Sequence, residues 1–269
     1  MRERNLTLIS KYFFATIKSI LLLIVFSNSW AVEENAKQLP PIIHLLLDDQ
    51  GDAPPISSGA FIEEDGLIVV EMESLDLPQG WTLKNDDADA LGSYIEWTDN
   101  NRLRAPGNGL ISIKVAINDP GTYQFLWRSS IREGVDTTES NDSFLRILAD
   151  NFYGFRSSDS SIVCPREQDD SNRCNGRDPE GASSDGWFKI YRSGGTPPDW
   201  IWVTRTSDSD AHRIYVDFDQ AGEYEIQISG RSQFHAIDRL VLFRSLNDAD
   251  NITENFATNS ARPESDRAP

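Results

Sequence analysis

Few side chains in this sequence could carry acid–base catalysis, and they are scattered. The adjacent pairs Asp86–Asp87 and Asp169–Asp170 each offer two carboxylates. A hydrolase dyad needs its two carboxylates on opposite sides of the bond that is cleaved, and neighbouring residues in a loop rarely face each other in that way. We therefore do not expect either pair to act as a catalytic dyad.

A base beside a positive charge, as in a polysaccharide lyase, is the other catalytic arrangement that the residue types allow. Tyr215 or His235 could supply the base. The charge could come from Arg128, Arg205, Arg213 or Arg231. Their spacing singles out no group, and the sequence has no Ser/His/Asp set, nucleotide-binding loop or zinc motif. We therefore assign no catalytic residues and expect a non-catalytic protein, with an enzyme as the alternative.

The first 31 residues are typical of a secretory signal peptide. Basic residues precede the apolar run 19-SILLLIVF-26, and Ser29 and Ala31 occupy the small-residue positions of a cleavage site. An uncleaved membrane anchor is the alternative, but the apolar run is short for a membrane span. We expect a secreted or periplasmic protein that leaves the membrane after cleavage.

The only two cysteines, Cys164 and Cys174, lie in the polar segment 164-CPREQDDSNRC-174. In an exported chain such a pair is typical of a disulfide that closes a loop. A zinc site is less favoured because zinc-binding spacing and nearby histidines are missing. We predict a Cys164–Cys174 disulfide, which would stabilise the fold by roughly 2 to 3 kcal/mol.

The chain is strongly acidic, with 25 Lys and Arg against 43 Asp and Glu and a formal net charge of −18. This charge argues against nucleic acid or an anionic membrane as a partner, because both would repel the protein. It also leaves carboxylates available for hard cations. An acidic surface that only keeps the protein soluble would explain the same composition.

The composition divides the chain into three parts after the signal peptide. Residues 32–65 contain two Pro-Pro pairs and scattered acids and are predicted to be a linker. Residues 246–269 lack an apolar period and are predicted to be a disordered tail. The range 66–245 is left as one domain, long enough to bury a core without metals.

Apolar residues in this domain alternate with a period of two, which predicts strands and no helix. The clearest example is 221-AGEYEIQISGRSQFHAIDRLVLF-243, and a similar segment, 119-DPGTYQFLWRSS-130, lies about a hundred residues earlier. Further strands are predicted at 67–74, 92–98, 110–117, 143–149, 186–191, 200–205 and 212–218. About nine strands separated by Gly, Pro, Asn or Asp turns predict an all-β fold, a β-sandwich of the jelly-roll type.

Four segments in this order resemble a known family. They are 71-EMES-74, the stretch from Trp81 through 92-GSYIEWT-98, 120-PGTYQFLWRSS-130 and 236-AIDRLVLF-243. Together they resemble the galactose-binding-like jelly rolls of non-catalytic carbohydrate-binding modules, of which families 6 and 35 are the nearest. The resemblance covers about 66–245, except for an insertion at 150–200.

The resemblance implies a structural Ca²⁺ bound by the two acids of the first strand and an Asp on the last strand. In this sequence the matching positions are Glu71, Glu73 and Asp238. A spacing of two would place both glutamates on one face of a strand, where their oxygens could converge on a hard cation. Alternatively, the glutamates face solvent or pair with Arg239.

The resemblance also implies a polysaccharide or oligosaccharide ligand, which needs flat apolar faces and a few polar side chains. Among the aromatic residues, Tyr94, Trp97 and Trp187 are candidate contacts, the two tryptophans because they lie near predicted strand ends. The family's sugar-binding Asn is replaced by Ala236, so His235 is a candidate substitute. We therefore predict non-catalytic glycan binding. The alternatives are a polysaccharide-active enzyme and an adhesion or assembly module that works with a partner enzyme or a surface complex.

Overall fold

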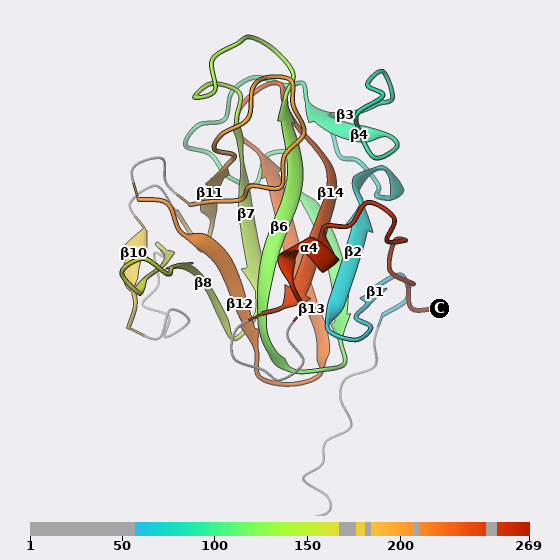
Figure 1. Ribbon diagram of the computed structural model, residues 1–269, viewed down its shortest axis with the longest axis vertical. Helices are drawn as coiled ribbons and strands as arrows, with labels where there is room; N and C mark the ends of the chain where they lie inside the picture. The colour runs from blue at the N-terminus through green and yellow to red at the C-terminus, as the bar shows by residue number, and fades with distance from the viewer. Residues whose placement is uncertain (1–56, 167–175, 181–183, 207–209, 246–251) are drawn as a thin grey trace, which may run out of the picture. The chain divides into compact units, whose positions relative to one another are not determined.

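The computed structural model describes residues 57–166, 176–180, 184–206, 210–245 and 252–269. Two β-sheets pack face to face, so the predicted all-β jelly-roll sandwich is confirmed (Figure 1). Within these ranges, no helix has the length and apolar character needed to cross a membrane. The predicted signal peptide and most of the predicted linker lie outside the described residues and stay predictions.

The smaller sheet has five strands and carries one side of the core. Its order is β1 (Phe61–Ile62), β5 (Ile111–Ile117), β13 (Gly222–Gly230), β7 (Asp142–Leu148) and β11 (Phe188–Tyr191). All its neighbours are antiparallel except β1 and β5. Because β1 belongs to this sheet, the end of the predicted linker is part of the domain.

The larger sheet has nine strands. Its path is β10 (Asp178–Glu180), β9 (Ser161–Pro165), β8 (Asn151–Arg156), β12 (Arg213–Phe218), β6 (Gly121–Ile131), β14 (His235–Arg244), β4 (Tyr94–Trp97) and β3 (Trp81–Lys84). The ninth strand, β2 (Leu67–Glu71), lies off this path and pairs with β14. A short 3₁₀-helix, η2 (Met72–Ser74), follows β2.

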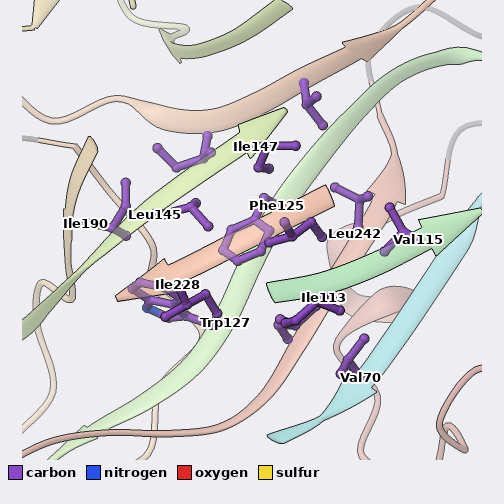
Figure 2. Close-up of a cluster of buried hydrophobic side chains, with 14 of the residues drawn as sticks. Val70, Ile113, Val115, Phe125, Trp127, Leu145, Ile147, Ile190, Ile228 and Leu242 are labelled. Atoms are coloured by element: carbon purple, nitrogen blue, oxygen red, sulfur yellow. The ribbon is translucent and has the colours of Figure 1, made fainter. Parts of the chain in front are cut away.

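The alternating residues of the two similar segments face each other across the core. The earlier segment becomes β6 and the later one becomes β13, one in each sheet. Phe125 and Trp127 of β6 pack in the same apolar cluster as Ile228 of β13 (Figure 2). Ile226 of β13 belongs to this cluster as well. The period of two therefore identified the two strands that line the core from opposite sides.

The strand prediction was wrong in two places that matter for the site. The strand predicted at 67–74 ends at Glu71, because η2 turns the chain there. The strand predicted at 200–205 is not a regular strand, and its residues make only isolated bridges from Ile201 to Ser129 and from Arg205 to Tyr191. Strands β3, β8, β9 and β10 were not predicted, because their apolar alternation is short or interrupted.

The predicted disordered tail is corrected for residues 252–269. This C-terminal segment contains the one-turn helix α4 (Glu254–Ala257), which lies over β14 and β2 on the outer face of the larger sheet (Figure 1). It packs there because that face is apolar. The cluster on this face consists of Leu67, Val69, Leu126, Val241 and Phe243, joined by Ala257 and Ile252. Residues 246–251 lie outside the described ranges.

Trp97 is enclosed by three glycines. A Cβ at Gly80, Gly109 or Gly230 would overlap its indole ring. The Trp97 ring also contacts Trp81 edge to face, with the ring centroids 5.3 Å apart. The glycines are therefore needed here for space, because only a residue without a side chain leaves room for the indole.

We expect Gly230→Ala to destabilise the domain by about 1 to 3 kcal/mol through overpacking against Trp97. Urea unfolding of the single variants and of the double variant with Trp97→Phe would measure the coupling between the two positions. The penalty should shrink in the Trp97→Phe background, because the smaller ring leaves room for the methyl group. An equal penalty in both backgrounds would contradict this packing argument.

Candidate functional site

Asp238 lies at an irregularity in the central strand β14. The pairing of β14 with β6 shifts register between Ile237 and Arg239. On its other side, β14 pairs with β4 up to Ile237 and with β2 from Arg239 onward. The residue between these two segments is therefore Asp238, whose side chain is fully buried. Bulges of this kind commonly redirect a side chain next to a functional site.

The three predicted calcium ligands each have one buried oxygen without a hydrogen-bond partner among the described residues. These atoms are Glu71 Oε2, Glu73 Oε2 and Asp238 Oδ1. Such unsatisfied buried acceptors are rare and call for an explanation. A bound cation would provide a partner for such oxygens.

Neighbouring groups satisfy the other carboxylate oxygen of Asp238 and of Glu73. Asp238 Oδ2 accepts from the Leu91 N–H at 3.0 Å and from the Arg128 guanidinium. Glu73 Oε1 accepts from the Ser93 N–H at 3.3 Å. Loop 85–93, which joins β3 to β4, therefore closes over two of the three carboxylates.

Burial and mutual repulsion shift the carboxyl groups towards protonation. Burial raises the pKa of Asp238 to about 6, Glu71 contributes to the rise, and Arg128 opposes it. Burial also raises the pKa of Glu73, and the charges of Glu71 and Asp238 raise it further. The three groups are therefore close enough to repel one another when they are ionised.

This donor set fits a hard cation in its chemistry. Ca²⁺ is bound by carboxylate and carbonyl oxygens, and the charge of the ion would offset the repulsion. As they are placed, however, the described residues contain no group of three His, Cys, Asp or Glu side chains that could hold a metal ion. Glu71 is instead ion-paired with Arg239, as the alternative interpretation expected.

The two glutamates reach this region in a different way from the prediction. Glu71 is the last residue of β2, whereas Glu73 lies within η2. The two therefore do not share one strand face. It is the turn after the strand that brings Glu73 towards loop 85–93.

An aromatic and charged cluster lies next to these carboxylates. The half-buried Trp200 donates its Nε1–H to Asp87 Oδ2 at 3.0 Å, and its ring centroid is 5.1 Å from that of Tyr94. The guanidinium groups of Arg128 and Arg132 each lie 5.5 Å from the Trp200 ring centroid. The cluster thus surrounds a partly accessible indole with hydrogen-bonding groups.

Arg128 connects the aromatic cluster to the carboxylates. One of its nitrogens donates to Asp238, and Nη2 donates to the carbonyl of Asp89 at 2.8 Å, while its guanidinium lies over Trp200. A displacement of Asp238 or of loop 85–93 would therefore be transmitted to the indole.

The structure buries all four predicted sugar-contacting residues, and their contact with a ligand stays a prediction. Trp97 and Tyr94 are 1% exposed, Trp187 is 4% exposed and His235 is 0% exposed. The Arg146 guanidinium covers the Trp187 ring at 4.6 Å. A residue near a strand end can be covered by the next loop, and sequence alone does not show this.

Tyr94 still belongs to the candidate site, although it offers no open face. Its ring supports Trp200, and its hydroxyl donates to Asp86 at 2.6 Å. Burial and this hydrogen bond raise the pKa of Tyr94 to about 12. Trp200 begins the predicted strand 200–205 and was not among the candidate contacts selected from the sequence.

Trp97 is one of the residues that line a pocket of about 420 Å³. The polar lining residues are Gln79, Asp99, Arg102 and Asn108. Pro78 and Leu110 add an apolar wall. This pocket is a second place where a small polar ligand could contact the domain.

The residues considered for catalysis do not form an accessible base. His235 and Tyr215 are both buried. His235 Nδ1 lies 2.8 Å from the Ser143 hydroxyl, and its ring packs against Trp127. Asp86 and Asp87 are engaged with Tyr94 and Trp200, while Asp169 and Asp170 lie outside the described residues.

Only one cysteine of the predicted disulfide lies in the described part of the chain. Cys164 is buried in β9. Cys174 lies outside the described residues, so the pairing stays a prediction.

No family model matches the sequence, and neither does any curated protein. Several solved structures are similar to part of this chain. The GH26-CBM35 β-(1,4)-mannanase of Podospora anserina is 14% identical with a TM-score of 0.41, and the match covers 69% of this chain and 29% of that one. A family 35 carbohydrate-binding module of Clostridium thermocellum is 13% identical, with a TM-score of 0.37 and coverages of 66% and 98%. A family 6 module of Clostridium stercorarium in complex with cellobiose is 12% identical, with a TM-score of 0.35 and coverages of 70% and 100%. These are similarities only, and the jelly-roll sandwich rests on the two packed sheets described above.

We expect His235 to make the domain sensitive to acid. Burial, together with the nearby charge of Arg192, lowers the pKa of His235 from 6.5 to about 3. The unfolded chain therefore takes up this proton near pH 6.5, whereas the folded chain does not until about pH 3. Stability is then lost as the pH falls between these values, by up to about 1.4 kcal/mol per pH unit.

Urea unfolding of the wild type and of His235→Gln between pH 7.5 and 4 would test this. The wild type should lose stability relative to the variant as the pH falls below 6.5. Ser143→Ala is the control, because it removes the hydrogen bond without removing the titrating group, and its difference from the wild type should not vary with pH. A pH-independent difference for His235→Gln would contradict the assignment.

Proposed function

We propose that this domain binds carbohydrate without cleaving it, at a surface centred on Trp200. The observation that carries the proposal is the half-buried indole of Trp200, which is surrounded by Arg128, Arg132 and Asp87. The C–H faces of a sugar ring pack against aromatic rings, while its hydroxyls need charged or polar partners nearby. Trp200 and its neighbours supply both kinds of group.

We also propose a structural Ca²⁺ held by Glu71, Glu73 and Asp238. Three buried oxygens without partners and the mutual repulsion of the three carboxylates support this proposal. The ion would supply positive charge to a buried acidic cluster. Its effect on the ligand surface would pass through Asp238 and Arg128, which lies over Trp200.

We propose that the protein acts outside the cytoplasm, because the predicted signal peptide would direct its export. The predicted Cys164–Cys174 disulfide fits the same setting. The partner in our proposal is a polysaccharide or an oligosaccharide. An enzyme or a surface complex that acts on the same glycan would be a second partner.

We expect Ca²⁺ to raise the melting temperature of the full chain relative to EDTA. An ion at about 100 times its Kd stabilises by about 2.7 kcal/mol, which corresponds to roughly 5 to 10 °C for a domain of this size. Differential scanning calorimetry at pH 7.5 would measure the shift.

Glu73→Gln should lose most of the calcium-dependent shift. Its melting temperature in EDTA should be equal to or above that of the wild type, because the substitution removes a carboxylate whose ionisation is disfavoured in the fold. Glu225→Gln is the matched control on the smaller sheet and should keep the full shift. Equal melting of the wild type in Ca²⁺ and in EDTA would rule out the calcium proposal.

We expect Trp200→Ala to abolish retardation of the full chain in affinity gels that contain the polysaccharide it binds. A panel of neutral and acidic polysaccharides would first identify a gel that retards the wild type. Tyr224→Ala is the control, since Tyr224 is a half-buried aromatic residue on the smaller sheet. Circular dichroism would check that both variants fold.

The gel experiment has outcomes that would overturn the proposal. Shortening of the polysaccharide during incubation would favour an enzyme. Absence of retardation on every gel would favour an adhesion or assembly module. Retardation of Trp200→Ala that is lost in Gln79→Ala would move the site to the pocket beside Trp97.

A further inference from the structure

We propose that a small monovalent anion, of the size of chloride, binds between the two sheets beside Trp127, Ser129, His235 and Arg192. Trp127 and Ser129 belong to β6 and His235 to β14, in the larger sheet. Arg192 directly follows β11 of the smaller sheet. This site lies inside the sandwich and does not depend on the proposed carbohydrate surface.

The four residues are enclosed by the core, and each has an unpaired polar atom. Trp127, Ser129 and His235 are 0% exposed and Arg192 is 1% exposed. The atoms without a hydrogen-bond partner among the described residues are Trp127 Nε1, Ser129 Oγ, His235 Nε2 and Arg192 Nε. Such atoms are rare, because burial removes their hydrogen bonds to water. Four of them in one region call for a shared partner.

The larger sheet places three of these residues together. Trp127 and Ser129 are two positions apart on β6, so they face the same side of the sheet. That side is the core, because Trp127 belongs to the central apolar cluster. His235 lies on the neighbouring strand β14, and its ring centroid is 5.7 Å from that of Trp127.

Arg192 reaches the same region from the smaller sheet. The Nδ1 atom of His235 lies 2.8 Å from the hydroxyl of Ser143, a residue of β7. Ser143 pairs with Ile190 of β11, and the Arg192 N–H donates to the carbonyl of Asn141 at 3.0 Å. Arg192 is therefore close to the contact that joins the two sheets, and its charge lowers the pKa of His235.

Arg192 is a buried cation that is bonded to carbonyls rather than to a carboxylate in the described part of the chain. Its Nη1 donates to the Asp199 carbonyl at 2.8 Å, and its Nη2 donates to the Gly194 carbonyl at 3.1 Å. The negative charge of Asp199 favours the guanidinium, but burial has the larger effect and lowers the pKa of Arg192. A buried charge is costly unless an opposite charge lies nearby.

This set of donors favours an anion over a water molecule. Trp127 Nε1 and Arg192 Nε can only donate hydrogen bonds. The Ser129 hydroxyl can donate as well, and His235 donates through Nε2 when the Ser143 hydroxyl donates to Nδ1. An anion would accept from all four groups and would compensate the charge of Arg192, whereas water would bring no charge. Since one negative charge compensates one guanidinium, His235 stays neutral.

Differential scanning calorimetry of the full chain in sodium chloride and in sodium gluconate, at equal sodium concentration and pH 7.5, tests this inference. Gluconate is too large for an enclosed site. The melting temperature should rise with chloride and level off, by roughly 5 to 10 °C once chloride exceeds its Kd about 100-fold.

Trp127→Phe should lose the chloride-dependent shift, because it removes the N–H and keeps an aromatic ring. Ser129→Ala, a smaller change, should reduce the shift. Trp97→Phe is the matched control and should keep the full shift, because the buried indole of Trp97 already donates its Nε1–H to the Asn100 carbonyl at 3.1 Å. Each shift is measured within one variant, so a general loss of stability does not affect the comparison.

Crystals grown in sodium bromide would locate the ion directly. An anomalous difference peak at the bromine edge, within hydrogen-bond distance of Trp127 Nε1 and Arg192 Nε, would support the site. Density there without an anomalous signal would identify a water molecule and overturn the proposal. Equal melting of the wild type in chloride and gluconate, or an undiminished shift in Trp127→Phe, would overturn it as well.

Discussion

A carboxylate buried in the middle of a β-sheet is the constraint on which this site depends. Asp238 sits where β14 changes partners from β4 to β2, and its side chain has no access to water. A buried charge is costly unless opposite charge and hydrogen bonds compensate it. Arg128 and the Leu91 N–H satisfy one oxygen, and in doing so they fix β6 and loop 85–93 relative to β14. The guanidinium of Arg128 also lies over the Trp200 ring, so one side chain connects the buried Asp238 with the candidate ligand surface.

Most aromatic side chains of this domain are buried, and their surroundings differ from one ring to the next. Trp97 needs three glycines around it, whereas Trp127 packs on His235 and Phe125 within the core. His235 is neutral in this setting because an imidazolium would have no compensating partner. These residues explain why an aromatic-rich sequence can leave few aromatic faces open. Most of the rings are used to fill the space between the two sheets or to support a neighbouring loop.

Much of the fold could be predicted from alternation of apolar residues, and less of the site. Strands β6, β13 and β14 were recognised because apolar residues recur at every second position around Phe125, Ile226 and Leu240. This period is what a half-buried strand requires. The calcium candidates came from a family resemblance, and the structure brings them near one another by a turn that the alternation did not reveal. The burial of Trp97 and His235 was not foreseen, because contacts with residues distant in sequence leave no local signal. The C-terminal segment was misjudged for a related reason. Its polar composition conceals Ile252 and Ala257, which pack on an apolar face of the larger sheet.

The position of residues 264–268 also bears on the order in which the domain assembles. Val69 and Ser265, which are hydrogen-bonded neighbours, are 196 positions apart in the chain. Contacts between such distant residues form late, because a long loop must close before they contribute any stability. The sandwich can therefore pair most of its strands before the C-terminal segment docks on β2. During synthesis, the Val69 N–H of β2 would lack this partner until nearly two hundred further residues had emerged.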